Sequence, residues 1–271
     1  MNCIDFEYDG IRLSDFDSMV GNITTSSDVE THSIGNNINF NTVYMNSSNK
    51  FNLISTQYSE AYTDTFQICR NFCKSNRDFY DDHEVSNIMR WLNRKTFKKF
   101  KPVYSDSEYS NVYYYASFNI NPIRLSGYVI GFEVTMQTNA PFGFYEPDEY
   151  IFSITEEDNK FTIFDTSDEV GSSYPDLVKI QLLSSGDLNI KNSWGDDILI
   201  KNCLNGETIE MVGEYKVITT DNASHTTLYN DFNYEFLKIH NDYDNTENTY
   251  TVSLPCNIFI SYSPICKGGV I

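Results

Sequence analysis

The chain has 271 residues, a mass of 31.3 kDa and a formal net charge of −19 at pH 7. Hydrophobic residues make up 40% and charged residues 21%, which is enough to build a packed core and excludes a largely disordered chain. The excess of acid excludes a protein that recognises nucleic acid directly, because such binding needs clustered lysine and arginine.

Several other classes are excluded by what the sequence lacks. No run approaches 18 consecutive apolar residues, so no membrane insertion is expected, and the first five residues show no signal peptide. The six cysteines form no CxxC pair and none of the four histidines lies at metal-ligand spacing from a cysteine, so we expect neither a metal nor a cofactor. Motifs of catalytic nucleophiles, zinc hydrolases and phosphate loops are absent, so we expect no enzyme.

The first part of the chain predicts mainly strands. Ile4–Tyr8 alternates, Asp9-Gly10 is a strong turn signal and Ile11–Leu13 follows, which together indicate an N-terminal hairpin. Further strands are predicted over Asn37–Tyr44, Phe51–Tyr58, Tyr62–Cys69, Val112–Ile120 and Gly127–Gln137.

One segment has helical rather than β periodicity. Its apolar residues follow the i, i+3, i+4, i+7 pattern: Val85, Ile88, Met89 and Leu92. Asp81 or Asp82 can cap the N-terminus, and basic residues suit the other end. The pattern predicts a helix from about 83 to 96.

A basic run lies on and just after this helix, in a protein that is otherwise acidic. Its members are Arg90, Arg94, Lys95, Lys98, Lys99 and Lys101, and it encloses Trp91. One interpretation is helix C-terminal charge that adds solubility. The other is one half of an electrostatically complementary interface, to which the nearby Tyr113-Tyr114-Tyr115 would add aromatic surface. Charge alone does not distinguish these two interpretations of the basic run.

The composition changes near Thr138–Gly143, where we place a domain boundary between residues 1–139 and 140–271. The first part has 12 basic and 16 acidic residues and the second has 7 and 22, so the net charges are −4 and −15. Short strands divided by Gly, Asn and Asp turns predict a β-sandwich or jelly roll in the second part. These strands are Tyr150–Thr155, Phe161–Phe164, Leu177–Leu183, Asp187–Asn192, Ile198–Lys201, Glu207–Val212, Glu214–Thr219 and Tyr250–Tyr262.

The second part offers weak candidates for binding. Acidic groups such as Glu156-Glu157-Asp158 resemble glycosidase or calcium carboxylates, but a solvated face explains them better. Trp194, beside Asn192 and Asp197, is a candidate glycan contact through ring stacking, against the simpler interpretation of an ordinary sandwich aromatic.

An ordered set of motifs resembles the phage distal tail proteins, the Dit family. In the first part the matching segments are Phe6–Gly10 with Leu13–Phe16, His83–Leu92 with Lys99-Phe100, and Gly131–Met136 running into Thr138–Gly143. In the second part they are Tyr174-Pro175, Ile190–Asn192, Gly206–Ile209 and Tyr262 with Pro264.

The resemblance implies a mainly β protein of the virion, synthesised in the host cytoplasm. It implies an N-terminal β-sandwich with one helix and an extended hairpin, which forms a homohexameric ring, and a C-terminal galectin-like β-sandwich. Such a ring joins the tail tube protein to the tail-tip hub or tail-associated lysin protein, and offers attachment to receptor-binding proteins through the C-terminal domain.

A closed ring needs one patch to meet a different patch on the next copy. We expect the basic run, with Arg90, Arg94, Lys98 and Lys99 foremost, to lie at that interface. A channel that passes DNA should not attract it, so we expect an acidic or neutral lumen. The alternative function is a carbohydrate-binding β-sandwich module that mediates host-surface adhesion.

Overall fold

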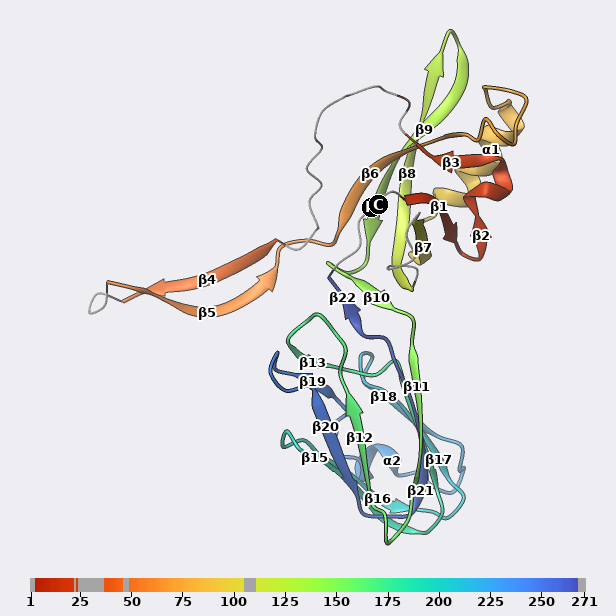
Figure 1. The fold of residues 1–271 in the computed structure, drawn as a ribbon. Coiled ribbons are helices and arrows are strands. Elements are labelled where there is room, and N and C mark those ends of the chain that lie inside the picture. The colour runs from red at the N-terminus through yellow and green to blue at the C-terminus, as the bar shows by residue number, and fades with distance from the viewer. Residues whose placement is uncertain (1–2, 22, 24–36, 46–48, 105–110, 268–271) are drawn as a thin grey trace. The chain divides into compact units, whose positions relative to one another are not determined.

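The computed structural model describes residues 3–21, 23, 37–45, 49–104 and 111–267 (Figure 1). The chain divides into two compact units: residues 1–145 together with 266–271, and residues 146–265. Each unit has a hydrophobic core of its own. The expected division between residues 139 and 140 lies slightly earlier in the chain.

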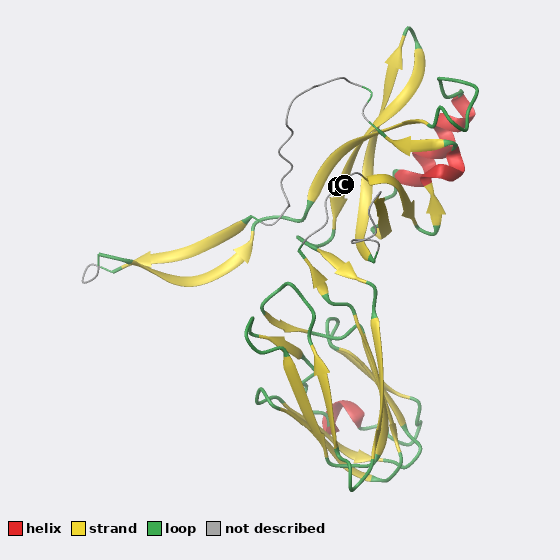
Figure 2. Cartoon of the chain, viewed as in Figure 1, coloured by secondary structure: helices red, strands yellow, loops and turns green. Residues whose placement is uncertain are grey.

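The first unit is built on one antiparallel sheet in the order β2-β1-β7-β8-β9-β6-β3, with β10 also paired to β8. Figure 2 shows the strands in yellow and the helices in red. Its strands are β1 (Cys3–Tyr8), β2 (Ile11–Arg12), β3 (Ser18–Val20), β6 (Thr63–Arg70), β7 (Lys98–Tyr104), β8 (Val112–Leu125), β9 (Tyr128–Thr138) and β10 (Gly143–Tyr145). A 3-10 turn, η1 (Leu13–Phe16), follows β2. The predicted N-terminal hairpin is confirmed, with Tyr8 opposite Ile11.

The predicted helix is present as α1 (Asp82–Leu92), and its buried residues Ile88, Trp91 and Leu92 join the core of the sheet. The expected end near 96 is wrong. Asn93 leaves the helical conformation, and β7 begins at Lys98, where Phe100 and Pro102 alternate inward. The lysines of β7 hide this alternation in the sequence, which is why the strand was not predicted.

Two further strands of the first unit stand apart from this sheet. β4 (Ile38–Tyr44) and β5 (Phe51–Tyr58) form a two-stranded antiparallel hairpin, and both strands coincide closely with their predicted ranges. Every residue of these two strands is exposed except Tyr58, which is half-buried. Its apolar side chains therefore lie outside the core of the unit.

The second unit is a β-sandwich, as predicted. The five-stranded sheet has the order β11-β21-β14-β17-β18 and the four-stranded sheet the order β12-β20-β15-β16. The strands of the first sheet are β11 (Asp148–Ile154), β14 (Leu177–Leu182), β17 (Thr208–Val212), β18 (Val217–Thr220) and β21 (Cys256–Tyr262). Those of the second are β12 (Lys160–Phe164), β15 (Gly186–Asn192), β16 (Asp197–Cys203) and β20 (Glu247–Val252).

The run Tyr250–Tyr262, predicted as one strand, is two strands. β20 and β21 belong to different sheets, and the chain turns between them at residues 253–255. Apolar residues of both sheets, including Ile190, Tyr250 and Ile258, meet in the core. Minor elements complete the chain: β13 (Gly171–Ser173) paired with β19 (Ile239–Asn241), α2 (Leu228–Asp231) and β22 (Ile265–Cys266).

Within the part of the chain that the structure describes, no helix is long and apolar enough to cross a membrane.

Candidate interaction surfaces

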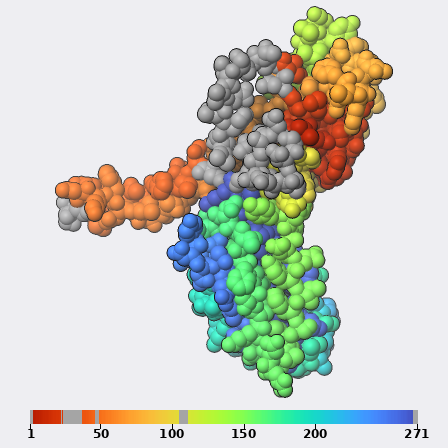
Figure 3. Space-filling view, viewed as in Figure 1, coloured from red at the N-terminus to blue at the C-terminus, as the bar shows by residue number. Residues whose placement is uncertain are grey.

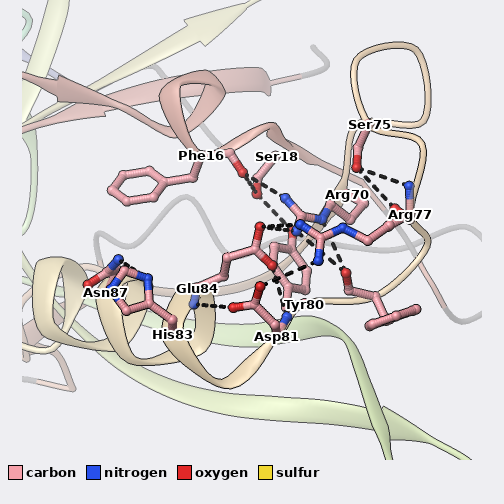
Figure 4. A network of polar contacts seen from close by, with 11 residues as sticks. Phe16, Ser18, Arg70, Ser75, Arg77, Tyr80, Asp81, His83, Glu84 and Asn87 are labelled. Carbon is pink, nitrogen blue, oxygen red and sulfur yellow. Dashed lines mark hydrogen bonds and ion pairs between the residues drawn. The ribbon is translucent and has the colours of Figure 1, made fainter.

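A buried arginine fastens helix α1 to strand β6 (Figure 4). Arg70 is 2% exposed, and its Nη2 lies 2.5 Å from Glu84 Oε1 on α1. Its guanidinium stacks 4.3 Å above the Tyr80 ring and donates hydrogen bonds to the backbone oxygens of Phe16 and Phe79. The charge is thus compensated on several sides, which a buried cation requires.

The same carboxylate also starts the helix. Glu84 Oε2 accepts from the Asp81 backbone N–H at 2.8 Å, and Asp81 Oδ1 accepts from the Glu84 N–H at 2.9 Å, which is a complete capping box. Burial alone would raise the pKa of Glu84, but the bonds from Arg70 and from the Asp81 backbone hold that pKa below its usual value. Glu84 therefore links the start of α1 to the sheet.

Trp91 lies inside the core of the first unit. It is 4% exposed, its indole N–H donates to the Tyr8 carbonyl at 3.0 Å, and its ring stacks on Phe6 and Phe16. Although we expected Trp91 at an interface, its visible role is to hold α1 against β1. Any effect on a partner would be exerted through the residues around it.

The basic run does not form one continuous patch. Arg94 Nη1 lies 2.7 Å from Asp9 Oδ2 and Lys98 Nζ lies 3.9 Å from Asp9 Oδ1, at the turn of the N-terminal hairpin. Arg94 also donates to the Trp91 carbonyl at 2.9 Å. These two cations are therefore engaged within the chain, at the end of α1.

The remaining basic residues point elsewhere. Arg90 on α1 and Lys95 after it are exposed. Lys99 and Lys101 lie on the face of β7 opposite the core, and Lys99 Nζ sits 4.1 Å above the Tyr113 ring. The structure thus brings Arg94 and Lys98 together, and places Lys99 and Lys101 on a separate face.

The β4–β5 hairpin separates apolar from polar side chains. Ile54 is an extra residue in β5, because the register passes from Asn41–Ser55 to Thr42–Leu53. This bulge shifts the alternation of β5, so that one face carries Ile38, Phe40, Thr42, Tyr44, Phe51, Leu53, Thr56 and Tyr58. The other face carries Asn39, Asn41, Val43, Asn52, Ser55 and Gln57.

Specific contacts agree with this separation. On the apolar face the rings of Tyr44 and Phe51 lie 5.4 Å apart, and on the polar face Asn41 Nδ2 donates to Ser55 Oγ at 3.0 Å. Phe40 is 64% exposed and Phe51 69%. The hairpin is drawn in orange in the space-filling view of Figure 3. An apolar surface of this kind marks a site of association. The strands were predicted, but the shared face depends on the bulge, whose only sign in the sequence is the adjacent apolar pair Leu53-Ile54.

Trp194 lies in the turn between β15 and β16, and it is half-buried. One face of its ring stacks on His240, with centroids 5.3 Å apart, and its indole N–H donates to the Glu247 carbonyl at 3.0 Å. His240 in turn hydrogen-bonds Asp196 at 2.6 Å. The opposite ring face is thus the one that a sugar could stack on.

A buried polar cluster in the second unit was not predicted. Glu207 is fully buried, and its Oε1 accepts from Thr220 Oγ1 at 2.6 Å and lies 2.7 Å from His225 Nδ1. The other imidazole nitrogen lies 3.4 Å from Asp231 Oδ2. The cluster joins the start of β17 and the end of β18 to α2 through side-chain contacts.

Among the described residues, no three or more His, Cys, Asp or Glu side chains are arranged so that they could hold a metal ion. Burial raises the pKa of Cys3 and of Cys256 to about 12 and that of Cys203 to about 11, so these thiols stay protonated. They are packing residues rather than ligands or nucleophiles.

Comparison with known proteins identifies the class. Residues 1–140 match the family model described as the phage tail protein N-terminal domain, and residues 142–262 match the phage tail C-terminal domain. The chain belongs to this family of phage tail proteins. It is a phage tail component and hence part of the virion. No curated protein matches the chain.

A solved structure supports the same fold. The chain is similar to the Dit protein of phage SPP1, whose crystal structure is described as a paradigm of the hub adsorption apparatus in phages that infect Gram-positive bacteria. The TM-score is 0.65 at 11% sequence identity, with 97% of this chain and 99% of that chain covered. The predicted Dit-like, mainly β, two-domain fold is confirmed.

Proposed function

We propose that this protein forms a hexameric ring at the distal end of the phage tail. The ring joins the tail tube protein to the tail-tip hub or tail-associated lysin protein, and its role is structural rather than catalytic. Residues 1–139 make the ring, and residues 140–271 form a platform that carries receptor-binding or other baseplate proteins. Membership of a phage tail family and the Dit-like fold support this assignment.

The apolar face of the β4–β5 hairpin carries the proposal. A two-stranded hairpin is marginally stable in water, and this one pairs with no other described strand. Burying one of its large apolar side chains contributes about 2 kcal/mol. Phe40, Phe51 and Leu53 lie on one face and are each more than half exposed, so docking on the next copy would stabilise both the hairpin and the ring.

The basic residues fit a second part of the same contact. Arg90, Lys95, Lys99 and Lys101 lie on the surface of the first unit, where they can meet acidic residues of the next copy. Arg94 and Lys98, held by Asp9, fix the end of α1 beside them. Trp91 supports the segment from the core.

One face of the sheet suits a channel. Opposite the core, β8, β9 and β6 place uncharged side chains side by side, in the rows Ser117–Gln137–Thr63 and Asn119–Thr135–Thr65. The next row, Asn121–Glu133–Gln67, adds one carboxylate and no cation. These three rows carry no cation and would not hold a polyanion, so DNA could pass along them. The cations of the same face, Lys99 and Lys101, lie beside the rows on β7.

The hairpin can be tested by changing one of its faces at a time. A double variant, Phe40→Ser with Leu53→Ser, removes two apolar contacts per copy and should shift the protein from hexamer to monomer in sedimentation velocity. The control, Asn39→Ser with Gln57→Ser, changes the opposite face and should leave the hexamer intact.

Both pairs of substitutions lie at exposed positions outside the core, so the unit should fold in either variant. A hexamer that persists in the apolar-face variant, at the same protein concentration as the wild type, would refute the role given to the hairpin.

A further inference from the structure

A shallow hollow lies on the outer face of the five-stranded sheet of the second unit. Its lining comes from four adjacent strands and consists of Ile151, Lys179, Gln181, Thr208, Asn257 and Phe259, with Ile258 below. These side chains point away from the sandwich core. No part of the proposed ring uses them.

The register arranges the lining in two rows. One row, Ser153–Asn257–Gln181–Thr208, carries only hydroxyl and amide groups across four strands. The row beside it starts with the apolar pair Ile151 and Phe259. The hollow therefore offers an apolar platform one step from a line of uncharged hydrogen-bonding groups.

The amides have capacity left for a ligand. Asn257 Nδ2 donates to Gln181 Oε1 at 3.2 Å, which leaves the Asn257 oxygen as an acceptor and the Gln181 amide N–H groups as donors. Ile151 is 76% exposed, so the platform is also open. A ligand with hydroxyl groups along one edge and a C–H face would satisfy both rows.

The charge of the hollow is balanced within it. Lys179 Nζ lies 2.7 Å from Glu210 Oε1 on the neighbouring strand, so this pair presents no net charge. The surrounding unit is strongly acidic, with 22 acidic and 7 basic residues from 140 onward. An anionic ligand would be repelled, and nothing in the lining favours a cationic one.

We propose that this hollow binds a neutral saccharide. The C–H face of a sugar ring stacks on Phe259 and Ile151, while its hydroxyl groups exchange hydrogen bonds with Gln181 and Asn257. This site goes beyond the proposed ring function, and it differs from Trp194, which lies in a turn of the other sheet.

The test is an array of oligosaccharides that pairs neutral hexose and N-acetylhexosamine chains with counterparts carrying uronic acid or phosphate, probed with the full chain. We expect neutral chains to bind and acidic counterparts to bind less. For one neutral oligosaccharide that binds, titration calorimetry should then show affinity lowered about tenfold or more by Gln181→Ala and by Phe259→Ala.

The control is Phe164→Ala, which removes an exposed phenylalanine from the other sheet and should leave the affinity unchanged. Trp194→Ala should also leave it unchanged. The proposal is overturned if no neutral saccharide binds, if only acidic ones bind, or if Trp194→Ala abolishes binding that the hollow variants retain. Saccharide binding can be measured with either the monomer or the ring, so the result does not depend on ring assembly.

Discussion

Glu84 should couple the stability of the first unit to pH. In Glu84→Gln the side chain can still accept hydrogen bonds, but Arg70, at 2% exposure, loses its counter-charge. Breaking such a buried pair costs about 3 kcal/mol, the lower end of the usual range, because Glu84 is itself 27% exposed. If the free energy of unfolding falls by about 2 kcal/mol per molar urea, the urea concentration at the midpoint of unfolding should be lower by about 1.5 M at pH 7.

The sign of the pH dependence follows from the lowered pKa of Glu84. Ionised Glu84 adds stability that is fully present above its pKa in the unfolded chain and is lost as the pH falls through its lower pKa in the folded chain. The difference in free energy of unfolding between the wild type and Glu84→Gln should therefore be constant near pH 7. It should become smaller as the pH drops below about 4.5.

Tryptophan fluorescence can isolate the first unit. The chain has two tryptophans, so in a Trp194→Phe background the buried Trp91 alone reports unfolding. Glu133→Gln, an exposed carboxylate on β9, is the matched control. The role assigned to Arg70 and Glu84 would be refuted if Glu84→Gln and the control had the same urea midpoint at pH 7. It would also be refuted if the loss of stability in Glu84→Gln were unchanged at low pH.

Three further predictions concern packing and reactivity. Phe118→Ala removes a ring that contacts Phe6, Tyr8, Phe66 and Phe100. It should lower the free energy of unfolding of the first unit by about 3–5 kcal/mol. Scanning calorimetry should therefore show the first unit, and not the second, unfolding at a lower temperature. His225→Ala leaves the buried Glu207 without its imidazole partner and should destabilise the second unit by about 2 kcal/mol; an unchanged second transition would contradict this. An iodoacetamide label should react in the native protein with the exposed Cys73 far faster than with the buried, protonated Cys3, Cys203 and Cys256, as peptide mass mapping would show; equal rates would contradict the burial.

Local signals in the sequence were sufficient to predict much of the fold. The Asp9-Gly10 turn, the periodicity of α1 and the alternation of β4 and β5 each depend on residues close in the chain, and all three elements are present. β7 was missed because its lysines lie on the outer face, between inward-facing Phe100 and Pro102.

The surfaces were harder to predict, because they depend on residues far apart in the chain. The basic run looked like one patch, but Asp9, more than 80 residues before, engages Arg94 and Lys98. Trp91 looked like an interface residue and is held by Tyr8 in the core. The hollow of the second unit unites strands from β11 to β21, a juxtaposition that no local pattern shows.

The mass of the purified protein in solution tests the central claim most directly. Light scattering after size exclusion, with negative-stain images of the same peak, distinguishes a ring from a free chain. A hexamer of 31.3 kDa chains predicts about 188 kDa and particles with a central hole. A monomer that stays monomeric when the tail tube and hub proteins are added would contradict the ring.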